Sequence, residues 1–176
     1  MAGRQSQDAA ALRAALIEQL AHLLREVEAL QQVIDIVPEP LQTARPLPEE
    51  PSVRETYGML VAADERVFLP AVQAFLTGQA RELELPDDDA LRTVENWNTY
   101  PLPAILKRLQ QVRRELVALL QQAPSEAWDR TASCEEETWD LYQYAYFIIQ
   151  HDTELLRALA YRLHAAYLPG KPRPVA

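Results

Sequence analysis

His151 is the residue in this chain with the clearest capacity for chemistry. It lies in Gln150-His151-Asp152, inside a segment whose apolar residues recur every three or four positions, which predicts a helix with His151 on its apolar stripe. A lone histidine there is most often a buried side chain satisfied by one hydrogen bond, and less often a general base or a metal ligand. Leu155, one turn later, has no donor atom, so a two-histidine metal site on this helix face is missing.

A general base needs an orienting partner, and several carboxylates are candidates. Asp152 and Glu154 are near His151 in sequence, but residues one and three positions further on point partly away from it. We therefore expect any partner to come from Asp64, Glu65 or another helix.

Other polar residues are not expected to do chemistry. Cys134 is the only cysteine, so no intramolecular disulfide can form, and the acidic residues at 135–137 should raise the pKa of its thiol. The acidic run 87–89 is interpreted as a solvated loop, because calcium needs a fuller set of correctly spaced oxygen ligands. His22 and His164 are expected to be solvated.

Composition and charge restrict the class of protein. The 176 residues carry a net charge of −9 and a pI near 4.8, which would repel phosphate backbones and anionic lipids, so neither nucleic acid nor a membrane is an expected partner. The start lacks the apolar core of a signal peptide, no later stretch has the ~20 apolar residues that span a bilayer, and a cytoplasmic location is expected. Four glycines among many Ala, Leu, Glu, Gln and Arg residues predict an all-α fold.

Periodicity predicts a four-helix bundle formed by one domain over 1–176. Ser52 and Glu55 form a capping box at the start of the second helix, Pro70 should kink or interrupt that helix, and Thr138 should cap the fourth. A proline-rich crossover follows the first helix, and a long loop separates the second helix from the third. The predicted helices are 8–36, 52–78, 103–122 and 137–167; the crossover is 37–51, the loop is 79–103, and 169–176 is a flexible tail.

Four aromatic residues cover more than one face of the last predicted helix: Trp139, Tyr142, Tyr144 and Tyr146. Core packing is the first explanation for these rings. A dimer interface is the second and the wall of a ligand pocket the third.

Several segments, taken together, resemble the DinB-like (DinB/YfiT-like) four-helix-bundle family. They are Ser52-Val53-Arg54-Glu55, the loop with Asn96 and Asn98, the stretch 109–116, Thr138-Trp139-Asp140-Leu141 and Gln150-His151-Asp152 in the last helix. The resemblance covers most of the chain. It implies a bundle that frequently forms homodimers, so a homodimer is expected here.

The resemblance also implies where a metal would bind. Metal-binding members use one histidine from the second helix and two from the last helix, four residues apart, and the matching positions here are Met59, His151 and Leu155. A thioether and an isobutyl group thus replace two imidazoles, which predicts a degenerate site with no metal cofactor.

Two functional hypotheses follow from this pattern. The preferred one is a noncatalytic small-ligand-binding or interaction protein with an apolar pocket near Met59, His151 and Leu155. The alternative is an enzyme similar to the family's metal-dependent thiol transferases or hydrolases, in which zinc or nickel binds His151 together with Glu55, Asp64 or Glu154. Within the enzyme class, a metal-free acid–base reaction at His151 is a weaker possibility.

Overall fold

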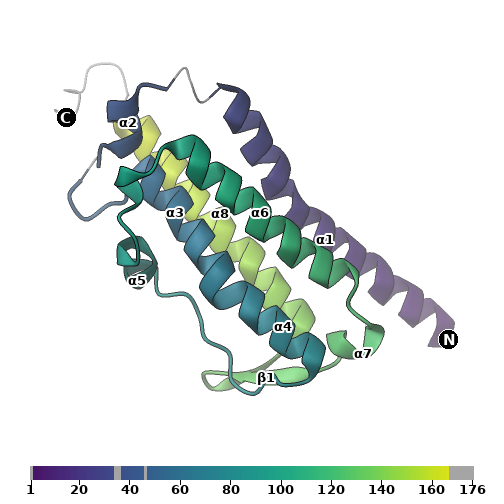
Figure 1. The fold of residues 1–176 in the computed structure, drawn as a ribbon. Helices are drawn as coiled ribbons and strands as arrows, with labels where there is room; N and C mark the ends of the chain where they lie inside the picture. Colours follow the sequence, from purple (N-terminus) through teal and green to yellow (C-terminus); the bar gives the residue numbers. More distant parts are fainter. Residues whose placement is uncertain (1, 34–36, 46, 167–176) are drawn as a thin grey trace.

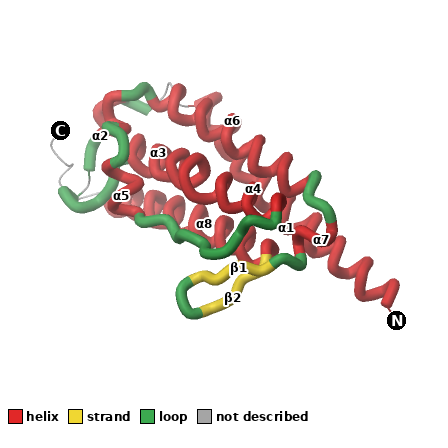
Figure 2. The backbone as a smooth tube through the Cα atoms, turned by 60° about the horizontal axis from the view of Figure 1, so that its bottom comes forward, coloured by secondary structure: helices red, strands yellow, loops and turns green. Residues whose placement is uncertain are grey.

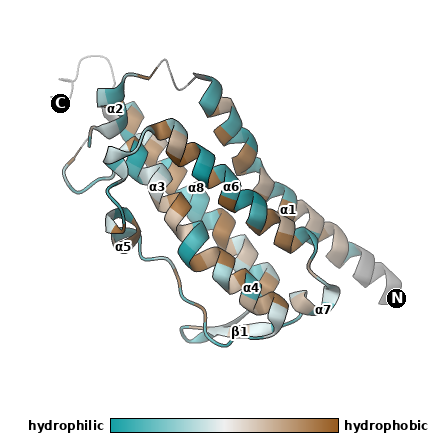
Figure 3. Ribbon diagram, viewed as in Figure 1, coloured by the Kyte–Doolittle hydropathy of each residue, from teal (hydrophilic) through white to brown (hydrophobic). Residues whose placement is uncertain are grey.

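Four long helical segments lie side by side in the computed structural model, which describes residues 2–33, 37–45 and 47–166 (Figure 1). They are α1 (Ala2–Val33), α3 (Val53–Ala63) continued by α4 (Leu69–Thr77), α6 (Leu102–Gln121) and α8 (Leu141–Ala166). Each carries both hydrophobic and hydrophilic residues along its length (Figure 3). The predicted all-α four-helix bundle is confirmed. In the described residues, no helix is both long and apolar enough to cross a membrane.

The core is built from the apolar stripes that the sequence shows. Leu16, Leu20, Leu23 and Val27 of α1 are buried, as are the leucines of α6 that face them. α6 spans Leu102–Gln121, within one residue of the prediction at each end. Residues 34–36 and 167–176 are outside those that the structure describes. The predicted C-terminal ends of the first and last helices, at 36 and 167, and the predicted tail 169–176 fall there.

The predicted capping box begins α3. Ser52 Oγ accepts a hydrogen bond from the Glu55 amide at 3.1 Å, and Glu55 Oε2 accepts one from the Ser52 amide at 2.8 Å. Each bond satisfies an amide that has no partner inside the helix, which explains why the helix starts here.

Pro70 interrupts the regular helix without ending it. A π-helical turn, η2 (Asp64–Phe68), precedes α4, and the Leu69 amide donates to the carbonyl oxygen of Asp64, five residues earlier. Pro70 then occupies the first turn of α4, the part of a helix that tolerates proline best. The helical path continues to Gly78, whose positive φ of 72° ends it.

The two connections contain short helices that the prediction lacked. The crossover includes α2 (Glu39–Thr43), and the predicted loop 79–103 includes α5 (Asp88–Thr93) and the 3₁₀ turn η3 (Trp97–Thr99). Asp87 caps α5, because its Oδ1 accepts from the amides of Asp89 and Ala90 at 3.0 and 3.2 Å. The three aspartates are exposed, as expected, but the interpretation of 87–89 as a loop is wrong, because α5 begins at Asp88.

The start of the last helix is also corrected. Residues 137–140 form β2 (Glu137–Asp140), which pairs antiparallel with β1 (Thr131–Cys134) in a hairpin at one end of the bundle (Figure 2). Thr138 pairs with Ser133 and caps nothing. Asp140 and Gln143 instead form the reciprocal cap of α8, with amide-to-side-chain distances of 2.9 and 2.8 Å. A short helix, α7 (Ser125–Trp128), precedes the hairpin.

The four aromatic residues near this hairpin have different environments. Tyr144 is fully buried against Phe68, with ring centroids 6.1 Å apart, so core packing explains it. Trp139 and Tyr142 are half-buried, and Tyr146 is exposed. None of these four residues lines the cavity beside His151.

Gly58 fixes the position of the segment that carries α5. The indole of Trp97 is almost fully buried against α3 at Gly58, and its Nε1 donates to the Leu91 carbonyl at 3.1 Å. A Cβ atom at residue 58 would lie 2.1 Å from Trp97 Cδ2, far inside contact distance. Only glycine allows this close approach of ring and helix.

We expect Gly58→Ala to lower the free energy of unfolding by about 1–3 kcal/mol, because the methyl group must displace the indole. The sign of this change distinguishes a steric clash from the usual effect, because replacing glycine by alanine inside a helix ordinarily stabilises the protein by roughly 0.5–1 kcal/mol. Urea unfolding of the wild type and variant measures the difference. In a Trp97→Leu background the same substitution should cost much less; an equal cost in both backgrounds would contradict the role given to the indole.

Candidate functional site

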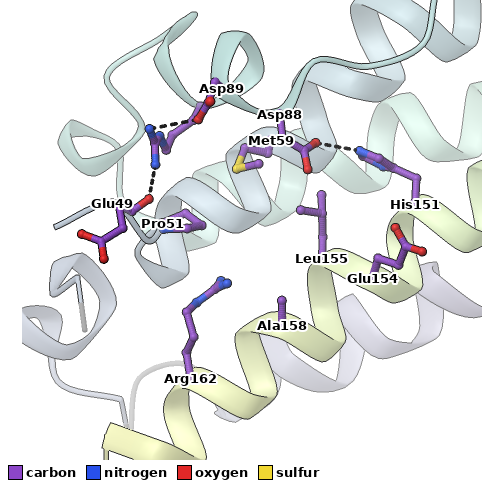
Figure 4. Close-up of a pocket in the computed structure, with 11 residues that line it drawn as sticks. Glu49, Pro51, Met59, Asp88, Asp89, His151, Glu154, Leu155, Ala158 and Arg162 are labelled. Atoms are coloured by element: carbon purple, nitrogen blue, oxygen red, sulfur yellow. Dashed lines mark hydrogen bonds and ion pairs between the residues drawn. The ribbon is translucent and has the colours of Figure 1, made fainter. Parts of the chain in front are cut away.

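His151 is buried on α8 and lies beside a small cavity (Figure 4). Its Nε2 is 3.1 Å from Asp88 Oδ1, and its ring lies edge-on to Phe68 with centroids 5.3 Å apart. The partner is therefore the first residue of α5. The partner comes from another helix, which was one of the expected sources, and neither Asp64 nor Glu65 provides the contact.

The cavity lies between α8, α3 and the start of α5 and has a volume of about 320 Å³. Met59, His151 and Leu155, the three positions singled out by the sequence, all line it. The prediction of an apolar pocket is incomplete, because charged residues contribute much of the lining. The other lining residues are Glu49, Pro51, Asp88, Asp89, Arg92, Glu154, Ala158 and Arg162.

Most of these charges already have partners. Asp88 contacts His151, and Asp89 pairs with Arg92 at 3.1 Å. Arg92 also donates to the Glu49 backbone carbonyl. The side chains of Glu49 and Glu154 are exposed to water.

Arg162 is bound differently from the other charged residues. Its Nη2 donates to Thr56 Oγ1 at 3.1 Å, and its Nε is buried without a hydrogen-bond partner among the described residues. No ion pair of Arg162 is found within the described ranges 2–33, 37–45 and 47–166. Burial lowers the pKa of Arg162, which shows that its charge is partly desolvated.

Most of the carboxylates considered for a rebuilt metal site form other interactions or lie away from the cavity. Glu55 is buried in the capping box and also pairs with Arg45, which together hold its pKa below the usual value despite burial. Asp64 lies in the core, and Glu154 is at the exposed edge of the cavity. Within the part of the chain that the structure describes, no three His, Cys, Asp or Glu side chains are grouped to hold a metal. This donor set does not fit a catalytic zinc or nickel ion.

Asp64 and Asp152 share one buried guanidinium. Arg113 of α6 donates to the two oxygens of Asp64 at 2.7 and 2.8 Å and to those of Asp152 at 2.5 and 3.0 Å. Asp152 is thereby turned into the core and is unavailable to orient His151. Desolvation raises the pKa of Asp64 to about 6, because Arg113 offsets only part of the burial and Asp152 adds repulsion.

The arrangement is poorly suited to acid–base or thiol chemistry. Asp88 Oδ1 lies within hydrogen-bond distance of Nε2 of His151, and the other ring nitrogen, Nδ1, is buried with no partner in the part of the chain that the structure describes. A substrate would have to displace Asp88 to reach Nε2. Cys134 is buried on β1, where desolvation together with Glu135 and Glu137 raises the pKa of its thiol.

The raised pKa of Asp64 predicts a pH dependence of stability. Between about pH 4 and pH 6 the folded protein holds a proton at Asp64 that the unfolded chain does not, so the stability from this residue falls as pH rises through that window. Asp64→Asn cannot titrate and should remove this part of the slope. Urea unfolding of both proteins at several pH values, with Glu136→Gln at the exposed turn as control, measures it. An unchanged slope would contradict the shift.

The sequence analysis identified Met59, His151 and Leu155, but it did not identify Asp88 as the partner of His151 or Arg162 as a residue of the cavity. The acidic run before Ala90 had one usable signal, since aspartate is a strong helix cap. Arg162 falls two turns after Leu155 on α8, which periodicity alone places on the same face.

Comparisons with known proteins agree with this fold. The solved structure of YfiT from Bacillus subtilis, described as a probable metal-dependent hydrolase with an unusual four-helix bundle topology, matches with a TM-score of 0.62 and 17% identity. The match covers 84% of this chain and 87% of that one. No curated protein matches significantly. The family model described as the DinB superfamily matches residues 22–154, and the chain belongs to this superfamily.

Proposed function

We propose that this protein binds a small molecule in the cavity beside His151 and does so without a catalytic metal ion. One observation carries the proposal. The three positions that the family resemblance assigns to metal ligands line a single cavity of about 320 Å³, yet they present a thioether, an imidazole and an isobutyl group.

The surroundings of these three positions support the proposal. Met59 and Leu155 are buried and apolar, and the imidazole nitrogen Nε2 is occupied by Asp88. A pocket with apolar walls and a few placed polar groups is the usual form of a small-molecule site.

The alternative function is a metal-dependent hydrolase or thiol transferase with a rebuilt site. It is favoured by one observation, since Asp88 and Glu154 line the same cavity as His151 and supply carboxylate oxygens there. Asp88 would have to release His151 and turn with it toward a shared ion. Metal binding separates this alternative from the proposal.

We expect tag-free purified protein to contain well below one equivalent of zinc, nickel or manganese per chain, before and after incubation with a small excess of each ion. The cavity offers one imidazole, where three or four donors are normally needed. Plasma mass spectrometry measures the content. Close to one tightly held ion per chain, lost in His151→Ala, would overturn the proposal and favour the enzyme.

Restoring the missing imidazoles provides a positive control. The double variant Met59→His and Leu155→His should bind about one zinc or nickel ion per chain, because three imidazoles would then line one cavity. Each single variant supplies two imidazoles and should bind far more weakly. Calorimetric titration of all four proteins measures the affinities. Equal affinity in the wild type and the double variant would show that these positions are not a degenerate metal site.

A further inference from the structure

We propose that the ligand of this cavity is a small organic carboxylate, held by Arg162 at its charged end and by Met59, Leu155 and Ala158 along its apolar part. This inference rests on the proposed function and adds the chemical class of the ligand. It follows from how Arg162 is placed, from the other charges of the cavity, and from the apolar surface next to it.

Arg162 reaches from α8 into the space between α8 and α3, where Pro51 and Met59 lie opposite (Figure 4). Thr56 Oγ1 holds Nη2 at 3.1 Å and so fixes the direction of the guanidinium. The hydroxyl carries no charge, and the buried Nε has no hydrogen-bond partner among the residues that the structure describes. A partly desolvated guanidinium with an unsatisfied N–H can bind a further hydrogen-bond acceptor, and a carboxylate matches its geometry with two parallel hydrogen bonds.

The acidic residues of the cavity do not cancel this charge. Asp88 and Asp89 are engaged by His151 and Arg92, and Glu49 and Glu154 face water, which screens them. Glu50 attracts the guanidinium electrostatically but forms no ion pair with it in the described residues. Arg162 is therefore the charge in the cavity that gains most from an oppositely charged ligand.

The apolar part of the ligand has a surface adjacent to Arg162. Leu155, Ala158 and Arg162 follow one another at helical spacing along one face of α8, and Met59 of α3 lies across from them. Figure 4 shows the methyl group of Ala158 between the longer side chains of Leu155 and Arg162. The short side chain leaves open the space that a ligand chain would fill, so Ala158→Leu should close it.

Three probes of matched length test the chemical class: hexanoate, its neutral amide and hexylammonium. Each is titrated into the full-length wild type while amide chemical shifts are followed, which reports both affinity and location. We expect hexanoate to bind beside Arg162 and Leu155, and hexanamide and hexylammonium to bind far more weakly. Arg162→Gln should weaken hexanoate binding roughly ten- to hundred-fold, as loss of a charge-assisted contact predicts.

Two further variants distinguish binding in this cavity from an effect of losing any surface charge. Arg157→Gln removes an exposed arginine of α8 that is outside this cavity and should leave hexanoate affinity unchanged. Ala158→Leu keeps the charge and should block hexanoate by filling the space. Circular dichroism spectra matching the wild type show that each variant is folded.

The outcomes are decisive for the ligand class. Absence of hexanoate binding, or equal binding by wild type and Arg162→Gln, would overturn the inference. Preference for hexylammonium would also overturn it, while leaving the proposed small-molecule site in place. Tight metal binding through His151 would instead refute the proposed function, so the two failures are distinguishable.

Discussion

The buried guanidinium of Arg113 is the constraint on which the site depends. It joins Asp64 of η2 and Asp152 of α8 to α6 inside the core, where all three residues are almost entirely shielded from water. Removing Arg113 would leave two buried carboxylates without a counter-charge, and removing either aspartate would leave N–H donors of the buried guanidinium unsatisfied, so the three helical segments are held in one relative position. Successive side chains on a helix are rotated by about 100°. With Asp152 fixed toward Arg113, His151 is directed toward Phe68 and α5.

A second constraint brings the partner of His151 to that place. Asp88 belongs to the long connection between α4 and α6, which is fixed where Trp97 packs on Gly58. Arg54 adds to this by donating to the Asn98 carbonyl at 3.0 Å, and Ser52 Oγ donates to Asn98 Oδ1 at 2.7 Å. The Ser-Val-Arg-Glu segment therefore both starts α3 and holds the connection that closes one side of the cavity.

The predictable parts of this protein are those determined by short-range chemistry. The capping box at Ser52 and Glu55 requires only four consecutive residues, and the stripe of α6 requires only a repeat of three and four. The hairpin was missed because β1 has only four residues, whose alternating burial is too short to stand out from the helical pattern around it. The contact of Asp88 with His151 joins residues 63 positions apart, and it depends on the tertiary packing of Trp97 and the contacts of Asn98. Sequence periodicity does not predict that packing, because it reflects only the local helix face.

Under the proposed function, the positive charge of the cavity differs in kind from that of a metal site. In a three-imidazole site the ion supplies the charge at the centre, whereas here Arg162 supplies it from the same face of α8, two turns beyond Leu155.

The two charges differ in the chemistry that they can perform. A metal ion accepts a lone pair, polarises it and lowers the pKa of a bound water. A guanidinium has no vacant orbital and only donates hydrogen bonds in a fixed plane. An arginine at this point can select and orient a carboxylate, but it cannot generate a hydroxide nucleophile. Together with the bond between Nε2 of His151 and Asp88, this difference supports the proposed binding site over the metal-dependent alternative.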